Sequence, residues 1–211
     1  MRQINRLVYF YLNDNFWFVT LCNRIRGHQP PAPKKEKQVV CIGLSGSGKS
    51  TALALIAGEP IKEIQSTNGF HVKDVILSDC ILNVKEIGGS EKIRKYWRHY
   101  YGGAQGVIFM VDGTTNEQEL ETARVAMFDA LKDPQLCDLP ILLLVTHQDM
   151  ENARSASEVA ELWNVREFYE DSVMEYGSSI KNIEQLKEAF SAFASILLHG
   201  VVGPTNVNVD I

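Results

Sequence analysis

The sequence predicts an α/β domain with a mostly parallel sheet that is covered by helices on both faces. Short apolar runs alternate along the chain with longer segments of helical periodicity, which is typical of strands buried on both faces. A glycine-rich turn lies between the first apolar run and the first helical segment, an order that open parallel sheets share. The length of 211 residues is sufficient for one such domain and additional terminal segments.

The individual elements follow from these patterns in chain order. Apolar runs predict five strands, the second and third of them paired, at residues 39–44, 70–77, 81–86, 106–112 and 141–146. Periodic segments predict four helices over residues 50–57, 117–131, 157–169 and 182–198. The domain is therefore expected to span residues 38–199.

The terminal segments differ from this domain in composition. Residues 1–26 are rich in aromatic side chains and approximate an amphipathic helix, which either lies on a membrane or packs on the domain. Prolines and lysines in residues 27–37 predict an extended spacer, and residues 200–211 predict a loose tail. Arg2 follows the first methionine, so the glycine needed for N-myristoylation is absent, and no uninterrupted apolar core indicates a signal peptide.

Composition limits the class of protein. Hydrophobic residues make up 45% and charged residues 22% of the chain, and no run of 18 apolar residues occurs, which argues against a membrane-spanning protein. The spacing of the cysteines fits neither a zinc site nor a dense disulfide framework and predicts reduced thiols in the cytosol; they are Cys22, Cys41, Cys80 and Cys137. Cys22 is a candidate for reversible palmitoylation.

Charge is distributed unevenly around a net value of -5. Residues 1–37 carry seven basic and two acidic residues, whereas the rest of the chain is strongly acidic. An acidic domain argues against nucleic-acid binding, and the basic leading segment favours an anionic membrane surface or an acidic partner. We therefore expect a cytoplasmic protein with peripheral membrane association.

Residues 43–50 match the phosphate-binding pattern G-x-x-x-x-G-K-[ST] between a strand and a helix. Small residues let backbone N–H groups surround phosphate oxygens, and the following helix directs its positive end toward them. Lys49 is expected to reach the β- and γ-phosphates and the Ser50 hydroxyl to ligate Mg²⁺. The predicted nucleotide contacts of this loop are Gly43, Ser45, Gly46, Ser47, Gly48, Lys49, Ser50 and Thr51.

This motif occurs in kinases, ATPases and GTPases, and later positions narrow the choice. Thr67 precedes a strand at the place where a switch threonine would complete the Mg²⁺ shell. Glu86 and Gly89 lie at the end of the third strand, where an acid near the metal and a glycine that senses the γ-phosphate are expected. Asp149 follows the fifth strand, where a carboxylate can accept from the guanine N1–H and exocyclic amine.

The chain resembles the Arf and Arf-like small GTPases over residues 38–199. The resemblance is carried by Ser66-Thr67-Asn68-Gly69-Phe70, by Gly88-Gly89, and by the segments Lys92-Ile93-Arg94 and Trp97-Arg98-His99-Tyr100. It implies a small-GTPase fold with six strands, a GTP/GDP site with Mg²⁺, and switch regions that reorder between the two nucleotide states.

The resemblance also implies partners and a membrane role. In this family the strand pair over residues 70–86 slides and expels the N-terminal helix toward a membrane in the GTP form. Effector proteins then bind through the switch regions, where residues 97–101 are either an effector surface or part of the core. Proteins of this type are also tied to vesicle trafficking, to signalling and to CBS-domain mediators of magnesium transport.

Two departures from the family concern the hydrolytic site. Ser90 stands where relatives usually carry the glutamine that orients the attacking water, so hydrolysis is expected to be very slow unless other groups support it. The catalytic positions implied are thus Thr67, Gly89 and the degenerate Ser90. Glu86 replaces the usual aspartate; it either reaches Mg²⁺ through a water or pairs with a nearby base.

A third departure concerns the base site, where Asn-Lys-x-Asp is replaced by Thr146-His147-Gln148-Asp149. Thr146 is expected to lose the amide that ties this loop to the phosphate loop. The His147 ring either stacks on the base or is a surface residue. A second base-binding loop is expected near Ser178 and Ser179.

These features favour a slow-cycling, Mg²⁺-dependent guanine-nucleotide switch that recruits partners at membranes. The alternative is an interaction scaffold of the same fold with weak or no nucleotide turnover. Nothing in the sequence resembles the arginine-bearing lid of a phosphotransferase.

Overall fold

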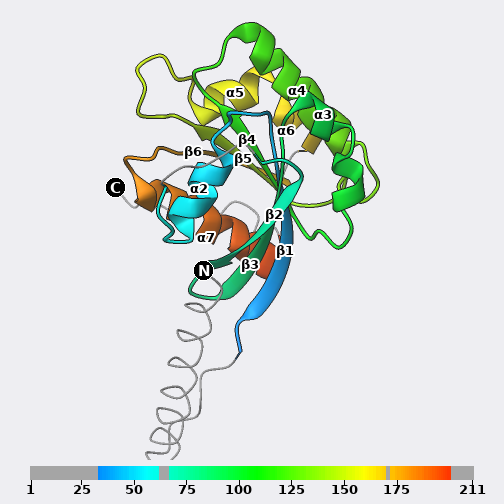
Figure 1. The fold of residues 1–211 in the computed structure, drawn as a ribbon, viewed down its shortest axis with the longest axis vertical. Coiled ribbons are helices and arrows are strands. Elements are labelled where there is room, and N and C mark those ends of the chain that lie inside the picture. The colour runs from blue at the N-terminus through cyan, green and yellow to red at the C-terminus, as the bar shows by residue number, and fades with distance from the viewer. Residues whose placement is uncertain (1–32, 62–66, 170–171, 201–211) are drawn as a thin grey trace, which may run out of the picture. The chain divides into compact units, whose positions relative to one another are not determined.

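The computed structural model describes residues 33–61, 67–169 and 172–200 (Figure 1). The chain divides into two units, Met1–Lys34 and Lys35–Ile211, and the sheet belongs to the second. The predicted helix over residues 1–26, the first part of the spacer and the tail beyond residue 200 lie outside the described residues. None of the helices in the described ranges has the length and hydropathy needed to cross a membrane.

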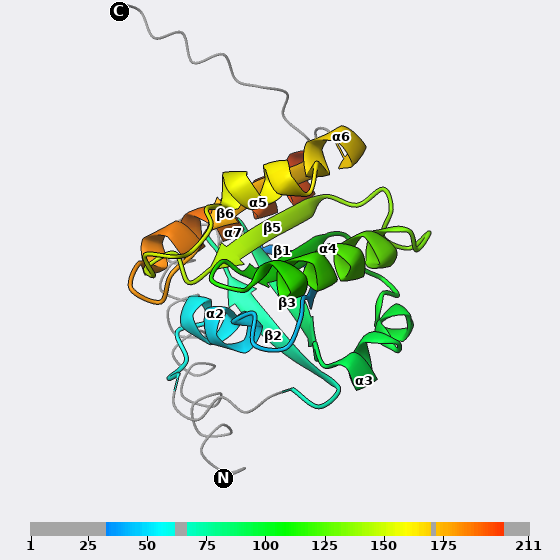
Figure 2. The ribbon, with the colours of Figure 1, turned by 90° about the horizontal axis from the view of Figure 1, so that it is seen from above.

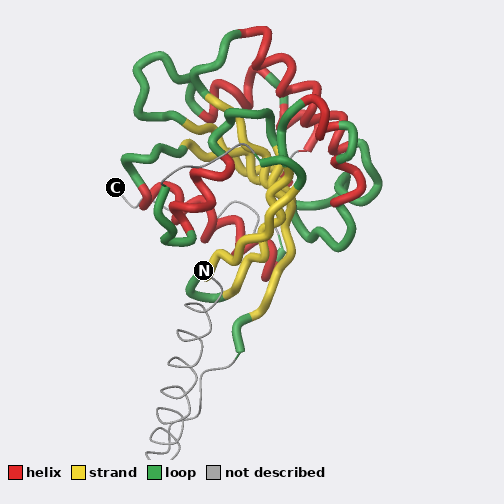
Figure 3. Tube along the Cα trace, in the orientation of Figure 1, coloured by secondary structure: helices red, strands yellow, loops and turns green. Residues whose placement is uncertain are grey.

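A six-stranded sheet forms the centre of the second unit, with helices outside it (Figure 3). Its strands lie in the order β2-β3-β1-β4-β5-β6. Their bounds are β1 (Lys35–Ile42), β2 (Phe70–Ile76), β3 (Cys80–Ile87), β4 (Val107–Asp112), β5 (Ile141–Thr146) and β6 (Val173–Gly177). The β2–β3 pair is antiparallel and the other pairs are parallel, which confirms the predicted mostly parallel sheet.

Helices cover both faces of this sheet (Figure 2). One face packs against α4 (Glu117–Leu131) and α5 (Ala156–Leu162), and the other against α2 (Lys49–Ile56) and α7 (Ile183–His199). Successive strand residues point to opposite faces of the sheet and so belong to different cores. Phe109 lies in the core with α4 and α5, whereas Met110 lies in the core with α2 and α7. Three short helices complete the described fold: α3 (Glu91–Arg94), the 3-10 helix η1 (Trp97–Tyr100) and α6 (Val165–Tyr169).

Local polar residues define where the helices begin. The Asn116 side chain accepts from the backbone N–H of Glu119 and caps α4. Ser155 and Glu158 form a reciprocal capping box at the start of α5. These caps satisfy N–H groups that a helix leaves free at its first turn.

The structure corrects two predicted bounds and locates one strand that the sequence did not place. The helix expected over residues 157–169 is two helices, because Asn164 between them adopts a left-handed φ of 51°. β1 begins at Lys35, so the end of the predicted spacer is strand, formed by charged residues that show no apolar pattern. The sixth strand, which the family resemblance implied without placing, is the half-buried β6 at the edge of the sheet.

Candidate functional site

The phosphate loop lies between β1 and α2, at the carboxyl end of a parallel strand where ligands bind in open α/β sheets. Gly48 precedes α2 with a φ of 77°, a left-handed conformation that glycine adopts readily. Gly43 approaches β4 so closely that a Cβ there would lie 2.1 Å from the carbonyl oxygen of Met110. Both glycines of the motif are therefore required by the backbone.

Lys49 points back into this loop from the first turn of α2. Its Nζ donates to the carbonyl oxygens of Gly43 at 2.9 Å and Leu44 at 2.6 Å, and to Ser47 Oγ at 3.2 Å. The residue is only 6% exposed, and burial lowers the pKa of its ammonium group. A buried cation held by neutral oxygens alone is suited to receive an anion.

Three oxygen-bearing side chains meet beside Lys49. Ser50 Oγ donates to Glu86 Oε1, and Thr67 Oγ1 donates to the same oxygen at 3.2 Å. The two hydroxyls are 3.4 Å apart, and Glu86 is almost fully buried. Ser50 belongs to α2, Thr67 to the segment before β2 and Glu86 to β3. The fold therefore brings together the three residues that the sequence predicted to hold Mg²⁺.

The chemistry of this set fits Mg²⁺. Mg²⁺ prefers oxygen ligands and is usually held by one or two carboxylates together with substrate phosphates and waters. Glu86 supplies one carboxylate, and Ser50 and Thr67 supply hydroxyl oxygens within reach of it. These residues are therefore compatible with a Mg²⁺ ion that completes its shell with phosphate and water.

Gly89, two residues after the end of β3, packs against the phosphate loop. A Cβ at this position would lie 2.2 Å from the carbonyl oxygen of Gly43 and 2.5 Å from the backbone nitrogen of Ser45. Ser90 follows in extended conformation before α3, and its side chain makes no capping hydrogen bond. The preceding Gly88 carbonyl accepts from Trp97 Nε1 at 2.8 Å, which attaches the strand end to η1.

A cavity of about 460 Å³ unites these groups. It is bordered by the phosphate loop, Thr67, Glu86, Gly89 and Ser90, and also by His147. A smaller adjoining cavity of about 50 Å³ is lined in part by Gly48 and Thr51 from the phosphate-loop region and by the predicted base-site residues Thr146, His147, Ser178 and Ser179. Predicted residues from distant parts of the sequence are thus brought together around one continuous region.

The loop that follows β5 is joined to the phosphate loop although Thr146 lacks an amide. Thr146 is buried, and its Oγ1 lies 3.3 Å from the carbonyl oxygen of Ser47 and 3.2 Å from that of Val111. A hydroxyl donates one proton, which these two carbonyl oxygens share. Threonine therefore replaces the missing amide with a shorter donor that reaches the phosphate loop directly.

Asp149 is the predicted guanine-reading carboxylate. Its Oδ2 lies 3.1 Å from Lys181 Nζ, and the hydrogen bond from Lys181 lowers the pKa of the carboxyl group, with a smaller contribution from Ser179. The adjacent Ser178 bonds through its backbone to both Val145 and Gln148, which fixes the second loop beside the first.

Two residues of this region were not predicted. Lys181 lies two positions beyond the expected second loop and has no motif of its own. Asp112 ends β4, and its Oδ1 lies 3.0 Å from His147 Nδ1. Its position at the carboxyl end of a parallel strand is a signal that could have identified it.

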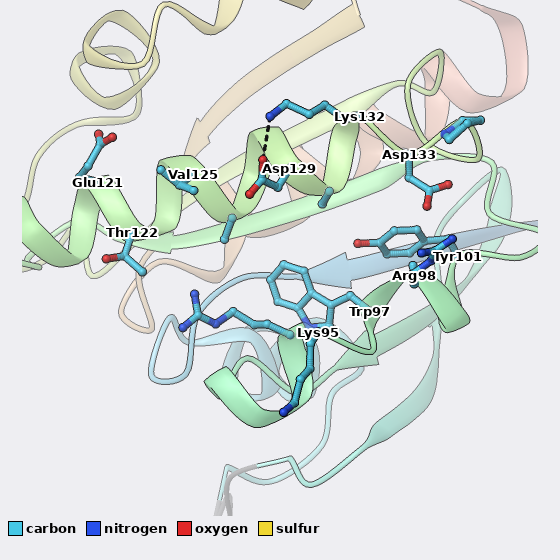
Figure 4. Close-up of a pocket in the computed structure, with 14 residues that line it drawn as sticks. Lys95, Trp97, Arg98, Tyr101, Glu121, Thr122, Val125, Asp129, Lys132 and Asp133 are labelled. Atoms are coloured by element: carbon cyan, nitrogen blue, oxygen red, sulfur yellow. Dashed lines mark hydrogen bonds and ion pairs between the residues drawn. The ribbon is translucent and has the colours of Figure 1, made fainter.

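The segment over residues 97–101 lies against α4 and borders a second, larger cavity of about 710 Å³ (Figure 4). Trp97 and Tyr101 are buried between this segment and α4, whereas Arg98 is exposed. On α4, Asp129 is paired with Lys132. Trp97 and Tyr101 at the two ends of the segment are therefore core residues, whereas Arg98 between them is exposed.

Comparisons with known proteins agree with this geometry. Residues 23–197 match the ADP-ribosylation factor family. ADP-ribosylation factor-like protein 15 of Bos taurus is 41% identical over 195 residues, which cover 89% of this chain and 92% of that protein. The proteins of the same name from Mus musculus and Homo sapiens are each 40% identical, over 89% of this chain and 91% of theirs.

A solved structure supports the fold. The Arl6 BBS3 small GTPase from Trypanosoma brucei, determined with the bound nucleotide analogue GppNp, matches with a TM-score of 0.70 at 24% identity. The match covers 78% of this chain and 98% of that one. With the family match over most of the sequence, these comparisons show that the chain belongs to the ADP-ribosylation factor family as an Arf-like small GTP-binding protein.

Proposed function

We propose that this protein is a Mg²⁺-dependent guanine-nucleotide switch with slow intrinsic hydrolysis. The observation that carries the proposal is the convergence of Lys49 with the Ser50–Thr67–Glu86 oxygen cluster at one cavity. Bound Mg²⁺ would neutralise charge on the β- and γ-phosphates. The Ser50 and Thr67 hydroxyls would hold it directly and Glu86 through a water, while Lys49 holds the phosphates.

Guanine selectivity is assigned to Asp149. An ionised carboxylate can accept two hydrogen bonds at once, from the guanine N1–H and from its exocyclic amine, and adenine cannot supply this pair. The low pKa of Asp149 keeps it ionised throughout the physiological range. Ser179 and Lys181 hold its carboxylate on the side of the second loop.

Slow hydrolysis is inferred from Ser90. Ser90 borders the phosphate cavity, but its hydroxyl is attached through a single methylene group and extends less far than a glutamine amide. A catalytic group that fails to position the attacking water loses most of its effect on rate. The protein would therefore remain in the GTP form for longer than relatives that carry glutamine.

Partner recruitment at membranes is the remaining part of the proposal. The switch segments, with Arg98 exposed between the buried aromatic rings, would present the effector surface in the GTP form. The basic residues within 1–37 would add attraction to an anionic membrane surface. By its similarity to ADP-ribosylation factor-like protein 15, we extend the proposed partners to CBS-domain mediators of magnesium transport.

Calorimetric titration of the full chain with GTP, GDP and ATP in the presence of Mg²⁺ tests this function. Micromolar or tighter binding of both guanine nucleotides, without a signal for ATP, is the expected result. Lys49→Ala and Ser50→Asn should abolish that binding and the thermal stabilisation that accompanies it. If none of the three nucleotides binds, the alternative of a protein-binding scaffold without nucleotide turnover replaces the switch.

A further inference from the structure

His147 lies where the phosphate cavity and the smaller base-side cavity meet. It follows β5 with a φ of 60°, a left-handed conformation that is uncommon outside glycine, and it borders both cavities. Its side chain is 38% exposed, so the ring is neither a core residue nor a freely solvated one. A ligand that fills either cavity would contact this imidazole.

The hydrogen bonds of the ring identify which nitrogen carries a proton. His147 Nδ1 lies 3.0 Å from Asp112 Oδ1 and 3.1 Å from Thr146 Oγ1. The Asp112 carboxylate can only accept, and it also accepts from the backbone and hydroxyl of Thr114. The Thr146 hydroxyl proton is already directed at the carbonyl oxygens of Ser47 and Val111, so its oxygen can only accept from the ring.

Both contacts therefore require a hydrogen on Nδ1, so Nε2 is the nitrogen without a hydrogen in the neutral ring. Within the described residues, Nε2 has no hydrogen-bond partner. In the neutral ring it presents a lone pair, which cannot bond to a phosphate or carbonyl oxygen of a ligand. Protonation converts it to a charged donor, and Asp112 on the opposite side of the ring balances the added charge.

We propose that His147 is a nucleotide-contacting residue whose bond to the ligand requires a proton, so that nucleotide binding takes up a proton from solvent and release returns it. The inference rests on the proposed function that a guanine nucleotide occupies these cavities. The protonated Nε2 donates to an oxygen of that nucleotide, while Nδ1 continues to donate to Asp112. His147 thus takes the place of the lysine that relatives carry, with a cation that depends on pH.

Several other charged groups lie near the ring. Lys49 and Glu86 face His147 across the phosphate cavity, and Asp149, paired with Lys181, lies two positions along its loop. Carboxylates ordinarily titrate well below pH 6, whereas imidazole titrates between about pH 5 and 8. If the imidazole of His147 causes a change in nucleotide affinity between pH 6 and 8, that change should disappear when a permanently charged residue replaces His147.

Calorimetric titration with Mg²⁺–GDP tests this inference on the full chain. We would compare the wild-type protein with His147→Lys at pH 6, 7 and 8, each in two buffers of different ionisation enthalpy. The wild type should take up more protons on binding than His147→Lys. Between pH 6 and pH 8, the Kd of the wild type should also rise more than the Kd of His147→Lys. For one proton taken up on binding, this rise is at most about tenfold per pH unit. Because both proteins bind the same nucleotide, titration of its phosphates cancels in the comparison.

Asp112→Asn provides the second variant. Asparagine retains an oxygen that accepts from His147 and Thr114 but removes the charge that stabilises the imidazolium, so proton uptake at pH 7 should fall below the wild-type value. Equal proton uptake and equal pH dependence in the wild type and His147→Lys would overturn the inference while leaving nucleotide binding intact. No binding by the wild-type protein at any pH would overturn the proposed function and this inference with it.

Discussion

The Thr146 hydroxyl oxygen lies 3.3 Å from the carbonyl oxygen of Ser47, although the two residues are 99 positions apart in the sequence. This contact joins the loop that follows β5 to the loop that follows β1. Thr146 is almost completely buried, and a buried carbonyl oxygen without a donor is unfavourable by about 1–3 kcal/mol. The base-side and phosphate-side loops therefore depend on each other even without a ligand.

Thr146→Val should separate these loops. Valine keeps the shape of threonine but removes the donor that Ser47 and Val111 share, so the free energy of unfolding should fall by about 1–3 kcal/mol. Urea denaturation without nucleotide measures this change. Thr146→Ser, which retains the hydroxyl, is the matched control and should lose less stability. Unfolding of Thr146→Val at the wild-type urea concentration would contradict the proposed contact.

Gly89→Ala should disrupt the approach of β3 to the phosphate loop. The added Cβ would meet backbone atoms at 2.2–2.5 Å, which cannot move without shifting the loop that carries Lys49. We expect a loss of about 1–3 kcal/mol in unfolding free energy and weaker binding of GTP. Gly102→Ala is the control, because its Cβ would lie no closer than 3.8 Å to the nearest side-chain atom. Equal stability of the two variants would refute the close approach.

The sequence was informative wherever one residue type has a single physical role. Fully apolar runs placed the central strands β4 and β5 because both faces of these strands are buried. The phosphate loop was located from its motif, whose first glycine permits the close approach to the Met110 carbonyl oxygen. The cluster of Ser50, Thr67 and Glu86 was predicted from the motifs and the family resemblance.

The features that were missed depend on tertiary context. Nothing local distinguishes the half-buried β6 from a loop, and the charged start of β1 is strand because it pairs with β3. The contact of Thr146 with Ser47 depends on how closely two loops approach, which motif comparison does not provide. Likewise, the pairing of Asp112 with His147 follows from the neighbouring positions of β4 and β5 in the sheet.

Asp149→Asn should change base selectivity. Its carboxylate is expected to accept two hydrogen bonds from guanine, whereas the asparagine amide presents a donor group on one side. Affinity for GDP should fall by at least about tenfold, because one polar group would then lack its partner. Xanthosine diphosphate, which carries a carbonyl oxygen in place of the exocyclic amine, should bind the variant better than the wild type. Competition against a fluorescent GDP measures both changes, and unchanged selectivity would remove Asp149 from the base site.

Ser90→Gln should accelerate GTP hydrolysis. Ser90 borders the phosphate cavity just before α3, and its side chain is not engaged in capping that helix, so a glutamine there can extend toward the attacking water. Correct positioning of a reacting group is worth roughly 10²-fold in rate. We therefore expect single-turnover hydrolysis to increase by about that factor, with GTP affinity close to that of the wild type.

Ser90→Ala distinguishes this explanation from a catalytic role of serine itself. If the serine hydroxyl contributes little because it is too short, alanine should hydrolyse GTP at the wild-type rate, and only glutamine should change it. A large loss of activity in Ser90→Ala would instead make the hydroxyl a working part of the site. A glutamine variant as slow as the wild type would mean that the attacking water is positioned by groups other than residue 90, and slow cycling would need another cause.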